Sequence, residues 1–440
     1  MDSGLPNILI IICHDLGQQL GCYGDPSLRT HNLDRLAQEG VRFENHFCTT
    51  PLCSPSRGSI ITGRYPHTNG LVGLAHRGFD LNEGEVTMAH YLKRKGYETH
   101  LFGFEHEARE PDIAKLGYEF LHRERPFKCA NVTPQLLAFL QARAAKESPP
   151  FLAMTGYSEV HRAFDQEMYT PDDPEEVFIP PYLPDTPEVR LDLAQFHGLI
   201  HAVDECVGKI FKTLEEKGLA ENTWVIFTTD HGIAFPRAKS TLYDPGIKTA
   251  LLMRWPTRLG LPPVRAGSRG EGFAGGRVFR ELISNIDLLP TILEATGAEV
   301  PESIQGKSFL ALLQGRKFEP REEIFAEKTY HDIYDPIRAI RTTRFKYIRS
   351  FEKMPNLPLP SDIRKSLSAR SVPEEFKGER PLVELYDLEA DPDEMNNLVG
   401  NPEYAEVEKE LDAMLTKWLE DTEDPILKGP ISAPPGAKVG

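Results

Sequence analysis

The chain has 440 residues, more than one domain usually contains, so we expect a large domain with a smaller one beside it. Hydrophobic residues make up 40% of the sequence and aromatic residues 9%, as in a folded globular protein and unlike a disordered chain. The 66 acidic residues outnumber the 50 basic ones, and the net charge of −16 argues against nucleic acid as the main partner. A small anionic ligand stays compatible with this charge, because a few basic residues suffice for a local positive pocket.

The sequence predicts neither a membrane segment nor a leader. Its longest aliphatic run, Ile8–Ile12, is far too short to cross a bilayer, and no basic segment precedes it. We therefore expect a cytoplasmic protein, or a periplasmic or secreted one if a leader has been removed. The six cysteines form no Cys-x-x-Cys pair, so neither a disulfide framework nor a zinc ribbon is expected.

Strand-like and helical segments alternate from the N-terminus to about residue 318. Residues 7–12 form a continuous aliphatic run, which is typical of a parallel strand buried on both faces. Other predicted strands and helices follow along the chain: strands at 97–103, 151–157 and 223–232, and helices at 90–96, 133–145 and 191–219. Alternation of this kind predicts an α/β fold, with a large, mostly parallel (mixed) sheet sandwiched by helices.

The pattern changes near residue 318. Three strand-like segments follow without long helices between them, at 322–330, 337–351 and 383–394, and a last helix is predicted at 403–421. These segments predict a smaller C-terminal antiparallel sheet packed with a helix. We therefore divide the chain into a catalytic α/β domain, 1–318, and a small α+β domain, 319–440. The proline-rich stretch 353–362 is predicted to be a long loop.

Polar motifs stand at the ends of predicted strands, where ligands bind in open α/β sheets. "CHDLG" follows the first strand and "TTDHG" ends the strand at 223–232. The segment "CSPSRGSIITG", with Cys53 and Arg57, is predicted to begin a helix, with Pro55 in its first turn. Free N–H groups and the positive end of the helix dipole attract anions there, and they lower the pKa of a cysteine.

The stretch "CSPSRGSIITGRYPHTNG" resembles the signature of the sulfatase family, part of the alkaline phosphatase superfamily, in which the cysteine is converted to formylglycine. The likeness continues in order and spacing through "NILIIICHDLG", "VIFTTDHG" and "ELYDLEADPDEMNNL". The fragments "DTPEVRLDLAQ" and "GIAFPRAKSTLYDPG" are most like the sulfamidase (N-sulfoglucosamine sulfohydrolase) branch. The resemblance implies a hydrolase that removes a sulfate ester or an N-sulfate from a sugar.

One divalent metal ion is implied by the same resemblance. It places the metal ligands at Asp15, Asp230 and His231, together with the formylglycine made from Cys53, while His14 stands where the family has another aspartate. Calcium prefers oxygen ligands, whereas imidazole suits manganese or zinc. The two histidines therefore favour a transition metal such as Mn²⁺ or Zn²⁺ over Ca²⁺.

The resemblance also assigns roles in catalysis. Cys53 would carry the nucleophile and Arg57 would orient it. His161 matches the family histidine that contacts the substrate near the leaving group, and a histidine suits donation of a proton there. Lys239 matches the basic residue that binds a sulfate oxygen, so His161 and Lys239 are the expected substrate-binding pair.

One position departs from the family pattern. The family has a Gly-Lys-x-His element after the strand at 97–103, and this chain keeps its histidine as His106 but has Phe104 in place of the lysine. One positive charge that holds sulfate is therefore missing. Either another basic residue replaces it, or the requirement for the leaving group differs.

Two other functions stay open at this point. A phosphonate monoester or phosphodiester hydrolase shares the fold, and sulfate and phosphate monoanions have similar size and shape. A non-catalytic binder of sulfated glycans is the weaker alternative, since a binder would not need a convertible cysteine. The partners expected for the leading hypothesis are a small sulfated sugar or oligosaccharide and a formylglycine-generating enzyme, and the oligomeric state stays open, a homodimer included.

Overall fold

The computed structural model describes residues 4–143, 148–256, 276–376 and 378–439. Its largest sheet has eight strands in the order β5-β4-β6-β1-β7-β8-β2-β9. The first five of these strands run parallel, β8 runs antiparallel to both of its neighbours, and β9 is parallel to β2. The strands are β1 (Asn7–Cys13), β2 (Val41–Phe43), β4 (Glu98–Gly103), β5 (Phe120–His122), β6 (Phe151–Gly156), β7 (Thr223–Thr229), β8 (Leu251–Arg254) and β9 (Arg277–Phe279). A two-stranded sheet pairs β3 (His46–Phe47) with β10 (Ile283–Ser284).

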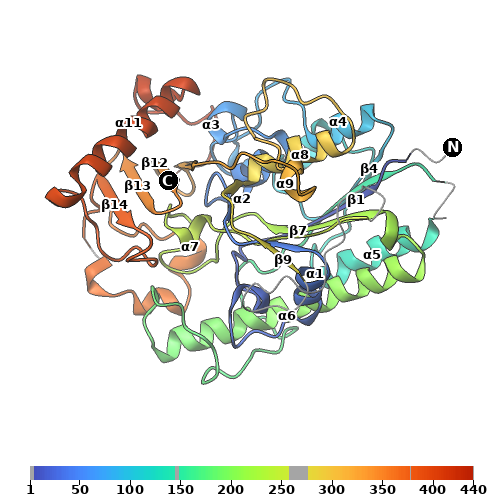
Figure 1. Cartoon of the computed structure of the whole chain (residues 1–440). Coiled ribbons are helices and arrows are strands. Elements are labelled where there is room, and N and C mark those ends of the chain that lie inside the picture. The colour runs from blue at the N-terminus through green and yellow to red at the C-terminus, as the bar shows by residue number, and fades with distance from the viewer. Residues whose placement is uncertain (1–3, 144–147, 257–275, 377, 440) are drawn as a thin grey trace.

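Helices cover both faces of the large sheet (Figure 1). One face carries α1 (His31–Glu39), α5 (Cys129–Ala142) and α6 (Pro187–Glu216), and the other carries α2 (Cys53–Thr62), α4 (Met88–Arg94), α8 (Leu288–Ala295) and α9 (Leu310–Leu313). Short helices α3 (Pro66–Asn69) and α7 (Asp244–Ile247) lie in the connections. Within the part of the chain that the structure describes, no helix has the length and apolarity needed to cross a membrane.

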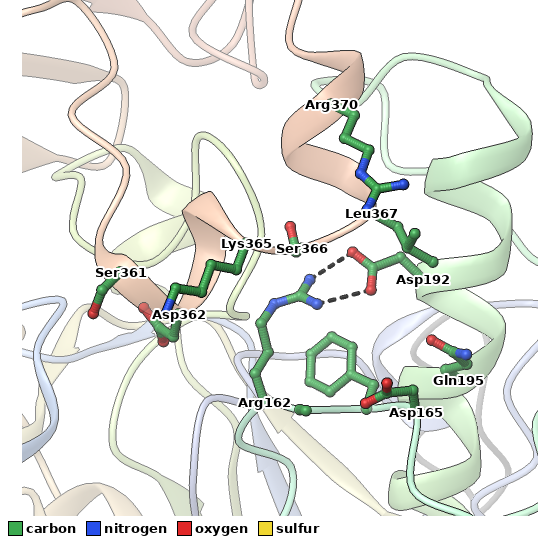
Figure 2. Close-up of a pocket in the computed structure, with 12 residues that line it drawn as sticks. Arg162, Asp165, Asp192, Gln195, Ser361, Asp362, Lys365, Ser366, Leu367 and Arg370 are labelled. Carbon is green, nitrogen blue, oxygen red and sulfur yellow. Dashed lines mark hydrogen bonds and ion pairs between the residues drawn. The ribbon is translucent and has the colours of Figure 1, made fainter.

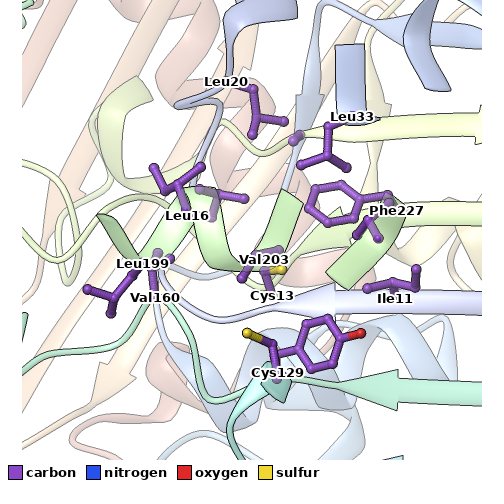
Figure 3. Packing of buried hydrophobic residues seen from close by; sticks show 14 of the residues in the cluster. Ile11, Cys13, Leu16, Leu20, Leu33, Cys129, Val160, Leu199, Val203 and Phe227 are labelled. Atoms are coloured by element: carbon purple, nitrogen blue, oxygen red, sulfur yellow. The ribbon is translucent and has the colours of Figure 1, made fainter. Parts of the chain in front are cut away.

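Strand β1 shows why the sequence forms this sandwich. Ile11 and Cys13 pack on the side of α5 and α6 (Figure 3). Ile10 and Ile12 pack on the opposite side, with α2 and α8. Successive side chains of a strand point to opposite faces, so a strand covered on both faces must be apolar throughout. Each of these side chains is at most 1% exposed, and full burial of such a side chain stabilises the fold by roughly 1.5–3 kcal/mol.

The C-terminal part forms the predicted antiparallel sheet, at the left of Figure 1. Its strands pair in sequence order, β11 (Glu323–Tyr330), β12 (Tyr334–Thr342), β13 (Phe345–Ser350) and β14 (Val383–Asp387), and α11 (Ala405–Asp421) packs on them. The fold class predicted from the sequence is confirmed, whereas the division into domains 1–318 and 319–440 stays a prediction.

Several element boundaries differ from the prediction. The single segment expected at 337–351 is a hairpin, because the Thr342 hydroxyl accepts hydrogen bonds from the N–H groups of Arg344 and Phe345 and closes a turn. Helix α6 begins at Pro187, where the Thr186 side chain caps it, rather than at residue 191. Helix α5 begins at Cys129 rather than 133, and residues 144 and 145 of that prediction lie outside the described residues. A short helix, α10 (Ser361–Arg364), begins within the predicted loop.

A buried ion cluster joins the C-terminal sheet to the segment that follows α2. Arg338 of β12 donates from Nε to Asp424 Oδ2 at 2.6 Å and lies 3.3 Å from Glu327 Oε2. His67 of α3 contacts the same carboxylate oxygen, with its Nδ1 2.7 Å from Glu327 Oε2. Their side chains are at most 1% exposed, so each charge depends on its partners for compensation.

We expect Arg338→Ala to lower the free energy of unfolding by about 3–5 kcal/mol, because it leaves Glu327 and Asp424 buried without their shared cation. The matched control is Lys417→Ala on α11, since Lys417 and its partner Asp421 are 73% and 60% exposed. The control should cost much less. Denaturant unfolding of both variants measures the difference, and equal losses would contradict a structural role for the cluster.

Candidate active site at the carboxyl ends of the central strands

The predicted site residues meet at one edge of the large sheet. Strands β4, β6, β1 and β7 are adjacent and parallel, so their carboxyl ends lie at the same edge. The loops that leave these ends carry residues 104–106, 161, 14–15 and 230–231 in that order. The first turn of α2 brings Cys53 to the same place. Open α/β sheets bind ligands at such an edge.

Five side chains form a compact group of potential metal ligands. Their ligand atoms all lie within 4.8 Å of one another, and each residue is at most 2% exposed: His14, Asp15, Cys53, Asp230 and His231. His14 Nδ1 lies 2.7 Å from Asp15 Oδ1 and 3.3 Å from Asp230 Oδ2. His231 Nε2 lies 3.1 Å from Asp15 Oδ1 and 3.5 Å from Cys53 Sγ. His14 therefore turns into the group and not away from it.

This donor group fits a divalent cation. Metal–ligand bonds of about 2.0–2.6 Å place donors on opposite sides of an ion about 4–5 Å apart, which is the span found here. Two carboxylates supply negative charge, and two imidazoles supply nitrogen donors. This mixture suits manganese or zinc better than calcium, which prefers oxygen throughout.

The carboxylate of Asp230 is fixed by backbone and side-chain donors. Its Oδ1 accepts the N–H groups of Asp15 and His231, both at 2.9 Å, and its Oδ2 accepts Arg57 Nε at 3.0 Å. Asp15 adopts a left-handed conformation with φ of 54°, which aspartate tolerates better than most residues and which turns the chain sharply after β1. Arg57 thus touches the group through Asp230.

Cys53 lies in the first turn of α2, with Leu52 as the N-cap. Burial alone would raise the pKa of its thiol, but the charges of Lys239 and His14 and hydrogen bonding to His106 lower that pKa well below its ordinary value. For His14, burial would lower the pKa, yet Asp230 and Asp15 raise it to about 10. The positive charges of Lys239 and His14 therefore compensate the negative charges of this group, on Cys53, Asp15 and Asp230.

Lys239 and His161 lie against the Asp15 side of this group. Lys239 Nζ donates to Asp15 Oδ2 and to Asp362 Oδ2, both at 2.7 Å. His161 Nε2 lies 3.9 Å from Asp15 Oδ2 and 3.7 Å from Asp362 Oδ2, and its side chain is 35% exposed. Burial and the neighbouring Lys239 ammonium lower the pKa of His161 to about 4. Asp15 and Asp362, held against Lys239, have lowered pKa values despite their burial.

Phe104 occupies the place where the resemblance implied a lysine. Its ring lies 5.1 Å from the ring of His14 and 5.1 Å from the guanidinium carbon of Arg57. The backbone reaches this position because Gly156, at the end of β6, has no side chain: a Cβ there would lie 1.8 Å from the carbonyl oxygen of Phe104. An aromatic face over Arg57 keeps the packing and removes one charge.

His106 lies at the margin of the site. Its Nε2 is 2.8 Å from Nδ1 of His76, and the two rings stack with centroids 4.9 Å apart. Burial and the neighbouring His106 lower the pKa of His76 to about 4. Neither His76 nor Asp362 was expected from the sequence. Asp362 lies in the proline-rich stretch, 123 positions from its partner Lys239, and no spacing or motif links the two.

Known proteins share sequence and fold with this chain. The Sulfatase family profile matches residues 6–298, more than half of the chain. An ulvan-active sulfatase of Formosa agariphila is 30% identical over 96% of this chain and 76% of that protein. Human N-sulphoglucosamine sulphohydrolase is 27% identical over 96% of this chain and 92% of that protein.

A solved structure shares the fold. The phosphonate monoester hydrolase of Agrobacterium radiobacter aligns with a TM-score of 0.72 at 21% identity, over 98% of this chain and 100% of that one. At this identity the similarity shows the fold alone. The signature helix, the strand-end motifs and the extent of the family match lead to one conclusion: the chain belongs to the sulfatase family.

Proposed function

We propose that the chain is a sulfuric ester hydrolase, dependent on formylglycine and a metal ion, that removes a sulfate ester or an N-sulfate from a small sugar or oligosaccharide. The main support is the position of Cys53, whose Sγ lies 3.5 Å from His231 Nε2 inside the ligand group, at a helix N-terminus. The names of the two relatives specify ulvan and N-sulphoglucosamine, which supports a sulfated sugar as the substrate.

Asp15, Asp230, His231 and His14 would hold the divalent ion, together with the modified side chain at position 53. When present, the ion supplies a Lewis acid for the sulfate oxygens and the formylglycine supplies a nucleophilic hydroxyl group. A dry, preorganised site makes such electrostatic assistance strong, and these residues are at most 2% exposed.

His161 is placed to move a proton at Nε2. Its Nδ1 lies 2.6 Å from the carbonyl oxygen of Arg162, which only accepts, so Nδ1 carries hydrogen and Nε2 faces the site. An anionic sulfate bound beside Lys239 would offset the ammonium charge and raise the pKa of His161. The imidazolium formed in this way would donate to the departing oxygen or nitrogen. Lys239 would hold a sulfate oxygen.

A phosphodiester or phosphonate monoester remains the second candidate substrate class. Phe104 removes one cation from the anion site, which favours a head group with one negative charge over a dianionic phosphate monoester. Sulfate esters, phosphodiesters and phosphonate monoesters all carry one charge. Turnover of matched aryl sulfate, aryl phosphodiester and aryl phosphate separates these classes, and a preference for the phosphodiester would replace our proposal.

Cys53 should be found as formylglycine when the chain is produced with a formylglycine-generating enzyme. Peptide mass spectrometry should then show the thiol replaced by an aldehyde or its hydrate. Cys53→Ser serves as the control, because it keeps the fold and cannot follow the same conversion of the thiol. Full activity in protein that retains only the thiol would contradict the prediction.

The metal preference should depend on His14. Elemental analysis of the purified protein should find one divalent transition metal per chain, and activity lost with a chelator should return best with Mn²⁺ or Zn²⁺. His14→Asp exchanges a nitrogen donor for oxygen and should shift the preference toward Ca²⁺. Calcium in the unaltered protein, with no change of preference in the variant, would refute an imidazole ligand at this position.

The contributions of His161 and Lys239 should separate by leaving group. His161→Ala should slow a sugar sulfate by about 10²–10⁴-fold and an activated aryl sulfate much less, because a good leaving group departs without a proton. Lys239→Ala should slow both substrates by similar factors, since both carry the sulfate. Steady-state kinetics measure the ratios. Equal losses for His161→Ala would exclude it as the proton donor and leave His106 as the next candidate.

A further inference from the structure

A polar pocket is lined in part by Asp362, the residue that contacts both Lys239 and His161. Its volume is about 560 Å³, within the roughly 300–1,000 Å³ typical of small-molecule sites. In Figure 2, Asp362 and Ser361 stand on one side, Asp192 and Gln195 of α6 on the other, and Arg162 between them. The pocket thus lies between the loop after β6, α6 and the C-terminal segment 361–370.

Asp362 is where this pocket meets the candidate active site. Its Oδ2 accepts from Lys239 Nζ at 2.7 Å and lies 3.7 Å from His161 Nε2. Its Oδ1 is buried and has no hydrogen-bond partner among the residues that the structure describes. A carboxylate oxygen only accepts, so Oδ1 requires a donor from a ligand or from water.

The walls of the pocket are fixed by hydrogen bonds. Arg162 donates from both terminal nitrogens to the two oxygens of Asp192, each at 2.7 Å, and from Nε to the carbonyl oxygen of Ala234 at 2.8 Å. The N–H group of Ser368 donates to Asp192 at 3.1 Å, which ties the C-terminal segment to α6. The cation of Arg162 is thereby paired, and Asp362 is held on a preorganised support.

The remaining groups give the pocket a mixed polarity. Lys365 and Arg370 add positive charge at its exposed margin, Asp165 adds negative charge, and Gln195 and Ser361 offer neutral donors and acceptors. Sugars present many hydroxyl groups, each both donor and acceptor, so a lining with both kinds of group suits them.

We propose that this pocket is the subsite for the sugar from which sulfate is removed, and that Asp362 determines specificity by accepting a hydrogen bond from a hydroxyl or amino hydrogen of that sugar. This inference rests on the proposed sulfatase function. A fixed carboxylate beside a bound sulfate repels it, and a donor on the sugar compensates that repulsion. A simple aryl sulfate has no such donor, so it meets the repulsion without the compensation.

The test measures Asp362→Ala on two classes of substrate. For a glucosamine sulfate, we expect Asp362→Ala to lower kcat/KM about 10- to 100-fold, the effect of removing one charge-assisted hydrogen bond. For p-nitrophenyl sulfate, kcat/KM should stay equal or rise, because repulsion is relieved. Asp421→Ala is the matched control, since Asp421 is 60% exposed and pairs with Lys417 on α11. It should leave both values unchanged.

A second variant tests the pocket without altering Asp362. Gln195→Trp should fill the pocket from α6, raise KM for the sugar sulfate and leave p-nitrophenyl sulfate unaffected, and thermal melting should show that each variant is folded. Equal losses for both substrates in Asp362→Ala would show that Asp362 acts only by holding Lys239 and would overturn the inference. The inference would also be overturned if either Asp362→Ala or Gln195→Trp left the turnover of the sugar sulfate unchanged. If the unaltered protein releases sulfate from neither substrate, the proposed function itself fails.

Discussion

The carboxylate of Asp15 is fully buried and must remain an anion, and the site is arranged around that requirement. A buried charge is tolerated only with partners that compensate it. Asp15 is fully buried, and it finds these partners in His14 and Lys239, with His231 3.1 Å away. The same groups lower the pKa of Cys53 or belong to the proposed ligand set. The side chains that compensate the charge of Asp15 are therefore also those proposed to carry the chemistry.

The sequence allowed the central part of this arrangement to be predicted, because each element carries a local pattern. The uniformly apolar β1 identified a parallel strand covered on both faces, and the polar residues after β1 and β7 had to meet once those strands were neighbours. The hairpin at Thr342 was missed because two strands joined by a two-residue turn look like one continuous strand. Asp362 was missed because its contact with Lys239 depends on how the two sheets pack, which no local pattern records.

Phe104 shows how a family pattern can change without loss of the site. The aromatic ring fills the space beside His14 and over Arg57, so the packing is preserved while one cation is lost. In the proposed function Lys239 would therefore carry more of the anion binding, and Lys239 is itself shared between Asp15 and Asp362. Asp362, which comes from the C-terminal segment, would therefore influence how strongly Lys239 binds an anion.

The burial of Cys53 also limits when this residue could be modified. Its side chain is 2% exposed, in a helix turn closed over by residues from across the chain, so an external enzyme has no access to the thiol in the folded protein. The proposed conversion of Cys53 would therefore have to come before the surrounding residues fold over it. Residue 362 leaves the ribosome long after residue 53, and helix α10 can reach Lys239 only then. In our proposal, the time available for conversion ends when the residues around Cys53 fold over it, and a mutation that hastens their folding would shorten that time.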